Sequence, residues 1–204
     1  QLSANLVVLS IKDWDNDLTP WPAPGLYPDD APFKGNADHS LHELTDCIIP
    51  ALEQQFCLAS TQRALAGYSL GGLFSLYGFI RLLAGDTLRG EPNATPSAPN
   101  NAPYFDSVAS LSSSVWYEGW PAFLQDTTFA GTDTFAYFSL GKKEKNAPPA
   151  ILGCVEDRTH LTAEFLANRG VKTAFVMEPG NHFQHVFERI TRGLRVLDEF
   201  YLQA

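Results

Sequence analysis

A serine flanked by glycines gives the sequence its clearest chemical signal. Gly67-Tyr68-Ser69-Leu70-Gly71 has the pattern G-x-S-x-G and stands between a strand-forming run and a helix-forming run. In such a turn the serine has strained backbone geometry at the start of a helix, and small neighbours let the backbone approach closely. The free N–H groups and the dipole of the helix favour negative charge there. The motif predicts Ser69 as a nucleophile and the Leu70 N–H as an oxyanion donor.

A serine hydroxyl needs a base, and the base needs an acid that holds its tautomer. The five histidines of the chain are His39, His42, His160, His182 and His185. The first two precede Ser69 and the third falls in a predicted helix, so surface or capping roles explain them more simply. His185 would already enter the last helix. His182 follows the last predicted strand, where a loop can place its ring over the serine, and we predict that it is the base.

The acid is expected at the end of the strand between these two residues, because sites of open α/β sheets gather at the carboxyl ends of strands. Glu144 lies four residues past a predicted strand over 134–140. Glu156 and Asp157 are weaker alternatives, since they fall at a helix start where capping explains them. Glu144 could also be one more charge in the run Lys142–Lys145. Its position favours the role of acid.

Strands and helices alternate along the chain. This order is needed if Ser69, Glu144 and His182 are each to follow a strand of one parallel sheet. Strands are predicted over residues 5–11, 63–68, 105–111, 134–140 and 172–177. Helices are predicted over residues 40–56, 73–80, 155–169 and 186–202. This alternation predicts a mainly parallel sheet with helices on both faces, a three-layer α/β/α fold.

Two stretches interrupt the alternation. Residues 12–38 are rich in Asp, Pro and Gly but also aromatic, which indicates an ordered loop that lines something. Residues 85–103 read as a surface insertion, and Asn93-Ala94-Thr95 within them is a glycosylation sequon by pattern only. No insertion is long enough to form a large cap domain, so residues 1–204 are expected to form one domain.

Composition excludes several classes of function. The chain has 204 residues, 45% of them hydrophobic, and a net charge of −9 without a dense Lys/Arg cluster, which argues against nucleic acids and anionic membranes. No apolar run approaches the roughly 20 residues that cross a bilayer. The three cysteines, Cys47, Cys57 and Cys154, have unrelated spacings that suggest neither disulfides nor a metal site. They are interpreted as small buried hydrophobic residues in a cytoplasmic protein.

Five ordered motifs resemble a known group of enzymes. They are Asp17–Pro20, Gly67–Gly72, Ser112–Trp116, Gly141–Glu144 and Gly180–His182. Together they resemble the esterases of the α/β-hydrolase superfamily that include enterochelin esterase-like and esterase D-like enzymes, over nearly the whole chain. The resemblance implies hydrolysis of carboxylic esters through an acyl-enzyme, without a metal or an organic cofactor.

The resemblance also assigns roles to residues. It implies Ser69 as nucleophile, Glu144 as acid and His182 as base. It further implies that Trp14 and Trp116, with Tyr68, bind the acyl or alcohol part of a small-molecule ester.

The chain departs from the group in two respects. The stretch Asp13–Asp17 lacks the arginine that siderophore-ester hydrolases usually carry there, so a polyanionic catecholate substrate is not expected. The strands that normally precede residues 5–11 are expected to be missing, together with the loop that supplies the second oxyanion donor. A backbone group near Lys12–Trp14 could replace that donor. A partner chain, as in a homo-oligomer, could cover the sheet edge.

Three hypotheses for function follow. The first is a serine hydrolase of small or medium neutral esters. The second is a catalytically silent α/β-hydrolase module that binds a ligand or partner through its aromatic loop over residues 14–33. The third is an acyltransferase that uses the same residues and an acceptor other than water.

Overall fold

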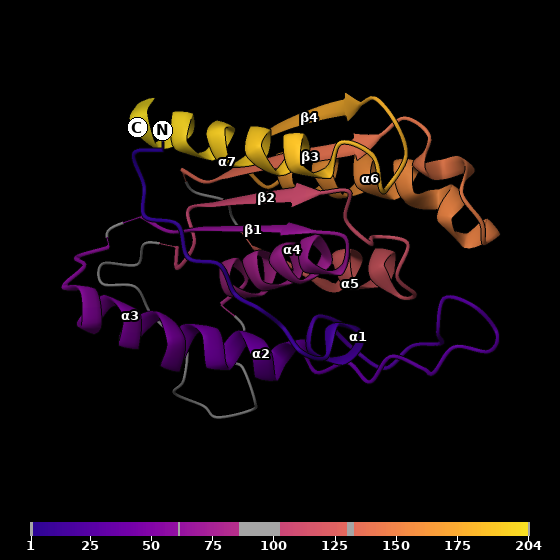
Figure 1. The fold of residues 1–204 in the computed structure, drawn as a ribbon, viewed down its shortest axis with the longest axis horizontal. Helices are drawn as coiled ribbons and strands as arrows, with labels where there is room; N and C mark the ends of the chain where they lie inside the picture. Colours follow the sequence, from indigo (N-terminus) through magenta and orange to yellow (C-terminus); the bar gives the residue numbers. More distant parts are fainter. Residues whose placement is uncertain (1, 61, 86–102, 130–132, 204) are drawn as a thin grey trace.

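Four parallel strands form the central sheet of the structure (Figure 1). The computed structural model describes residues 2–60, 62–85, 103–129 and 133–203. The strands are β1 (Ala64–Tyr68), β2 (Ser107–Leu111), β3 (Phe135–Gly141) and β4 (Lys172–Glu178), and they lie in the order β1-β2-β3-β4. Because every pair is parallel, all four carboxyl ends point to the same side of the sheet.

Helices connect the strands and cover both faces of the sheet. Those before β1 are α1 (Trp14–Asp17), α2 (Ala37–Glu43), the π-helical turn η1 (Leu44–Ile48) and α3 (Ile49–Phe56). Those after β1 are α4 (Leu70–Leu83), α5 (Trp120–Asp126), the 3-10 turns η4 (Glu144–Asn146) and η5 (Ala150–Cys154), α6 (Val155–Ala167) and α7 (Val186–Gln203).

The two faces of the sheet bury different partners. On one face, Ala136, Phe138 and Leu140 of β3 belong to a large core that includes residues of α4, α5 and α6. On the other face, Tyr137 packs with Leu197 of α7 in a smaller core. Alternate residues of a strand point to opposite faces, so β3, which packs on both of them, is buried from Ala136 to Gly141. The structure therefore has three layers, and α7 packs on one side of β1, β2 and β3.

The predicted α/β/α fold with a reduced parallel sheet is confirmed. The strands predicted over residues 63–68, 105–111, 134–140 and 172–177 correspond to β1 to β4 within two residues at each end. The helix predicted over 40–56 is a continuous helical stretch in three parts, α2, η1 and α3. Its π turn ends at Ile48, two residues before Pro50, whose ring nitrogen cannot donate the usual hydrogen bond to the carbonyl four residues earlier.

The prediction of a strand over residues 5–11 is wrong. In the structure this segment pairs with no strand of the described chain, and β1 is the edge of the sheet. The apolar side chains of residues 6–9 are exposed, with Val8 at 82%, whereas Ile11 is partly buried against the core. An apolar run becomes a strand only where a neighbour pairs its N–H and C=O groups, and β1 does not do so.

Further differences concern short elements and the cysteines. Sequence patterns did not predict α5. The residue before this helix, Gly119, has a left-handed backbone conformation, and the first residue of the helix, Trp120, is fully buried. The interpretation of the cysteines as buried is wrong for Cys47 and Cys57, which are exposed, and Cys154 is half-buried. Cys57 follows the last residue of α3, where a left-handed turn leaves the chain at the surface.

The loop predicted over 85–103, with its sequon, falls almost entirely outside the described residues. Among the helices of the described chain, none has the length and apolar character that crossing a membrane requires.

Candidate active site

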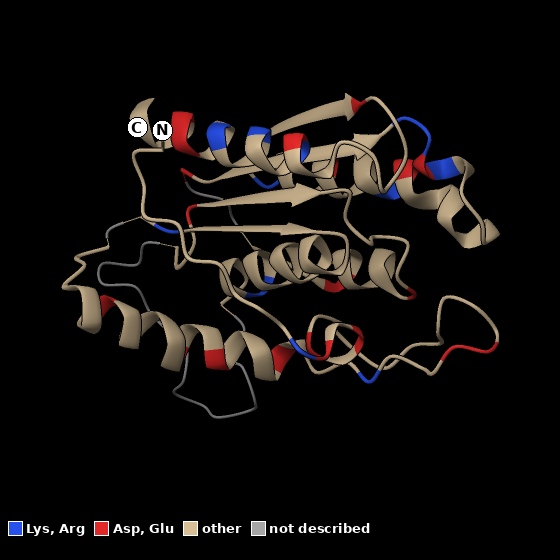
Figure 2. Cartoon of the chain, in the orientation of Figure 1, with Lys and Arg blue, Asp and Glu red and all other residues tan. Residues whose placement is uncertain are grey.

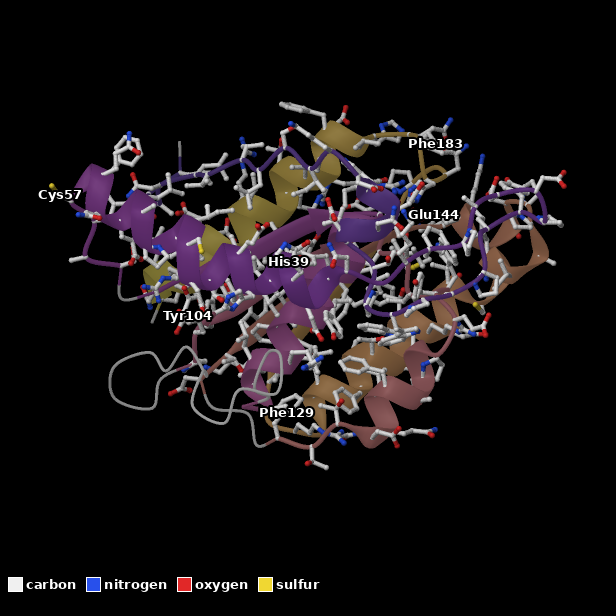
Figure 3. All side chains as sticks on the ribbon, turned by 90° about the horizontal axis from the view of Figure 1, so that it is seen from below. His39, Cys57, Tyr104, Phe129, Glu144 and Phe183 are labelled. Atoms are coloured by element: carbon white, nitrogen blue, oxygen red, sulfur yellow. The ribbon has the colours of Figure 1, made fainter. Side chains whose placement is uncertain are left out.

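The parallel sheet brings three segments together at its carboxyl edge. Ser69 follows β1, Glu144 follows β3, and His182 follows β4. Figure 3 shows Glu144 and Phe183, the neighbour of His182, toward the same end of the molecule, away from Cys57, which follows α3. The register between the strands thus places residues that are 113 and 38 positions apart within hydrogen-bonding distance.

Ser69 occupies a strained turn between β1 and α4. Its backbone angles are φ 58° and ψ −122°, a conformation that costs energy for a residue with a side chain. The turn requires glycine at position 67, because a Cβ there would lie 2.0 Å from the carbonyl oxygen of Gly71. The Ser69 N–H donates to the Leu111 carbonyl at 3.1 Å, and the Ser69 carbonyl accepts from the Ser114 N–H at 3.1 Å. These bonds fix the serine against β2.

Ser69, His182 and Glu144 form a continuous hydrogen-bonded line. Nε2 of His182 lies 3.0 Å from Oγ of Ser69, and Nδ1 lies 2.9 Å from Oε2 of Glu144. With the proton on Nδ1, the ring donates to the carboxylate and accepts from the hydroxyl. The Glu144 side chain is 5% exposed and that of His182 is 25% exposed, so the line runs from the interior to the surface.

Glu144 is held as a carboxylate by several donors. Its Oε1 accepts from Oγ of Ser112 at 2.8 Å, from the N–H of Gly141 at 2.7 Å and from Nη1 of Arg189 at 2.8 Å. Burial raises the pKa of Glu144, but the hydrogen bonds from His182, Ser112 and the Gly141 N–H outweigh it and lower the pKa. Glu144 is therefore ionised at neutral pH.

This lowered pKa predicts how Glu144 affects stability. A depressed folded-state pKa stabilises the fold above the unfolded value of about 4.5, and the stabilisation is lost as pH falls through the folded value. We expect Glu144→Gln to lower the free energy of unfolding at pH 6, and the difference from wild type to shrink below about pH 4. Urea denaturation at pH 6 and pH 3.5 measures this, with exposed Glu188→Gln as control. A difference that stays constant between the two pH values would contradict it.

Leu70, predicted as an oxyanion donor, is the first residue of α4. Its N–H lies in the first turn of the helix, where no intrahelical carbonyl is available to it. The N–H group and the helix dipole favour an anion beside Ser69. A second donor near Lys12–Trp14 stays a prediction.

The residues predicted to bind substrate lie in different surroundings. Tyr68 precedes Ser69, and its hydroxyl donates to the His182 carbonyl at 2.6 Å. Trp14 begins α1 and is 50% exposed. Trp116 is half-buried and packs against Phe33, with ring centroids 6.2 Å apart. In the described chain, the hydrogen bonds and ring contacts of the two tryptophans do not reach Ser69, so their pocket role stays a prediction.

The alternatives to His182 and Glu144 have other contacts. His42 pairs with Asp46 at 3.1 Å on the surface, and the ring of His160 packs against Phe175. His39 pairs with Glu43 at 3.4 Å, and His185 is exposed. Glu156 and Asp157 lie in the first turn of α6, where Glu156 pairs with Lys145 at 3.0 Å.

Sequence reasoning missed Arg189, which is 1% exposed and contacts Glu144. Arg189, Gly193 and Leu197 are the buried residues of α7 and recur every four positions. An arginine in the apolar register of a helix was the available signal. Among the described residues, no cluster of His, Cys, Asp or Glu could hold a metal ion.

A family model and a curated protein match parts of the chain. Residues 2–86 match the model of a family described as "Putative esterase". The curated protein YbbA of Bacillus subtilis, described as uncharacterized, is 24% identical over 157 residues, 76% of this chain. Because these residues cover 55% of YbbA, the chain spans about half of that relative's length.

Solved structures resemble the chain over nearly all of its length. The siderophore hydrolase EstA of Aspergillus nidulans matches 92% of this chain with a TM-score of 0.63 and 18% identity. An IroE-like serine hydrolase of Shewanella oneidensis matches 93% with a TM-score of 0.67 and 16% identity. The chain covers 66% and 58% of these two proteins. The likeness establishes that the chain has the α/β-hydrolase fold.

Proposed function

We propose that this chain, an α/β hydrolase by fold, is a serine hydrolase that cleaves carboxylic esters through an acyl-enzyme. One observation carries the proposal: the hydrogen-bonded line from Glu144 through His182 to Ser69, which ends on a serine in a strained turn at a helix start. This arrangement of acid, base and nucleophile is what acyl transfer requires. The match to an esterase family over residues 2–86 supports it.

The reaction begins with attack of Ser69 Oγ on the acyl carbon of the ester. His182 Nε2 accepts the hydroxyl proton as the new C–O bond forms, and the Leu70 N–H donates to the carbonyl oxygen as it gains negative charge. The tetrahedral species then collapses, the bond to the alcohol oxygen breaks, and His182 returns the proton to that oxygen. A water molecule, deprotonated by His182, attacks the acyl-enzyme in the same way and releases the acid.

Glu144 holds the imidazole in the tautomer that accepts at Nε2 and stabilises the imidazolium that forms. Its other oxygen is already occupied by buried donors, so the carboxylate cannot rotate freely. The hydrogen bond from Tyr68 to the carbonyl of His182 holds the base over the serine.

The charge distribution favours neutral substrates over anionic ones. Acidic residues recur along α1 and the loop that follows it, and the whole chain has a net charge of −9 (Figure 2). A field of this sign slows the approach of polyanions. Because EstA is described as a siderophore hydrolase, a siderophore ester is the substrate to compare with simple acyl esters.

The direct test is stoichiometric labelling by a fluorophosphonate, together with turnover of p-nitrophenyl acetate and butyrate. We expect one label per chain, located by peptide mass spectrometry on Ser69, and loss of turnover in step with labelling. Ser69→Ala is the control and should take no label. Absence of both label and turnover in the wild-type chain would refute the proposal and favour a ligand-binding role. Transfer of the acyl group to an added alcohol, with no free acid, would indicate an acyltransferase.

A further inference from the structure

The guanidinium group of Arg189 contacts Glu144 and several groups around the proposed catalytic site. Arg189 lies in the first turn of α7 and is 1% exposed. Its Nη1 donates to Oε1 of Glu144 at 2.8 Å, to Oγ of Ser112 at 2.8 Å and to the hydroxyl of Tyr68 at 3.2 Å. Its Nη2 donates to two carbonyls of the loop that leads to His182, those of Pro179 and Asn181, at 2.9 and 3.0 Å.

These contacts tie together segments that the chain brings from four strands. Glu144 follows β3, Ser112 follows β2, Tyr68 ends β1, and the loop bearing His182 follows β4. A guanidinium is planar and its donors diverge at fixed angles, so it sets the relative positions of several acceptors at once. A lysine ammonium would supply the charge but not this fixed fork.

The positive charge of Arg189 also affects how readily the Glu144–His182 pair takes up a proton. The carboxylate faces His182 with Oε2 and Arg189 with Oε1, so the cation and the imidazole share one negative charge. A neighbouring cation makes addition of a proton to the pair less favourable. Since the proposed mechanism needs neutral imidazole, removal of this cation is expected to move the acid limb of the activity profile to higher pH.

Other charged or titratable groups near the pair are accounted for. Tyr68 from β1 donates its hydroxyl to the His182 carbonyl, and Glu178 at the end of β4 pairs with Arg192 of α7 at 3.0 Å. Lys145 beside Glu144 pairs with Glu156 of α6, and exposed His185 follows in the loop before α7. Lys142 and Lys143 after β3 contribute backbone N–H groups that bond the carbonyls of Glu178 and Gly180. Among these groups, Arg189 is the cation in direct contact with Glu144.

We infer that Arg189 is a positioning residue that acts through Glu144: it fixes the carboxylate and the loop that leads to His182. The inference rests on the proposed function, since it describes the same site. It adds a residue of α7 to the site, although Arg189 does not contact Ser69.

The test compares the pH dependence of kcat/KM in Arg189→Met, Arg189→Gln and Arg189→Lys with wild type. Loss of a unit charge beside a buried pair shifts its apparent pKa by about one unit or more at an effective dielectric of about 20. We expect the acid limb of the Met and Gln variants to move up by at least about one pH unit. The Lys variant should keep the wild-type limb but lose about tenfold in kcat/KM, because it cannot bond both loop carbonyls. Arg195→Met, an exposed position of α7, is the matched control.

A second readout does not depend on catalysis. The imidazole titration of His182, followed by NMR and assigned from a His182→Gln variant, should shift upward in the Met and Gln variants. If the Met and Gln variants keep both the acid limb of kcat/KM and the imidazole titration of wild type, Arg189 is only a packing residue and the inference is wrong. If the neutral variants do not fold, a shifted limb in Arg189→Lys would overturn it. Wild-type protein without turnover would refute the proposed function, while the His182 titration would still decide the role of Arg189.

Discussion

Replacement of Ser69 or His182 by alanine is expected to lower kcat for p-nitrophenyl butyrate by about 10⁴- to 10⁶-fold. Ser69→Ala removes the oxygen that forms the acyl-enzyme. His182→Ala removes the group that accepts the proton, which leaves a hydroxyl of ordinary reactivity. Both side chains are at least partly accessible, so the loss should occur without a large change in the free energy of unfolding.

The double variant distinguishes a shared mechanism from two independent defects. Residues that act as a unit have strongly non-additive effects, so Ser69→Ala with His182→Ala should be little worse than either alone. His42→Ala removes a surface histidine that pairs with Asp46 and should leave kcat unchanged. Retention of wild-type turnover by Ser69→Ala would show that another group performs the chemistry.

Gly67→Ala and Gly71→Ala are expected to have opposite effects, although both glycines belong to the same motif. A Cβ at position 67 would lie 2.0 Å from the oxygen and 2.2 Å from the carbon of the Gly71 carbonyl. Backbone cannot be displaced as a flexible side chain can, so β1 and α4 must separate. We expect Gly67→Ala to lower the free energy of unfolding by about 3 kcal/mol or more and to abolish esterase activity.

At position 71, by contrast, a Cβ would meet nothing within 4 Å. In a helix, alanine is more favourable than glycine by up to about 1 kcal/mol, so Gly71→Ala should leave the free energy of unfolding unchanged or raise it. Urea denaturation of both variants beside wild type measures the difference. Similar stabilities for the two variants would show that the close approach of β1 to α4 is not what requires glycine at position 67.

The sequence alone predicted much of the framework. The apolar runs that became β1 to β4 are of strand length and alternate with helical periodicity, which specifies a parallel sheet through local propensity and crossover handedness. Gly67 in the Ser69 motif indicates that the backbone segments of the turn approach too closely for a side chain, so the sharp turn could be predicted from the sequence. That Ser69, Glu144 and His182 lie together could be predicted because parallel strands end on one side of a sheet.

Features that depend on contacts between residues far apart in the sequence were decided only by the tertiary structure. Residues 5–11 have the composition of a buried strand, yet the neighbour that would pair their backbone is absent from the described sheet, so they are exposed. The hydrogen bond from the Tyr68 hydroxyl to the carbonyl of His182 is visible only in the folded chain, and the substrate-binding role of Tyr68 stays a prediction. Arg189 is far from Glu144 in sequence, and its role follows from the packing of α7 over β1, β2 and β3. Local pattern determines which elements form, whereas long-range packing determines which side chains meet, because a contact depends on both of its partners.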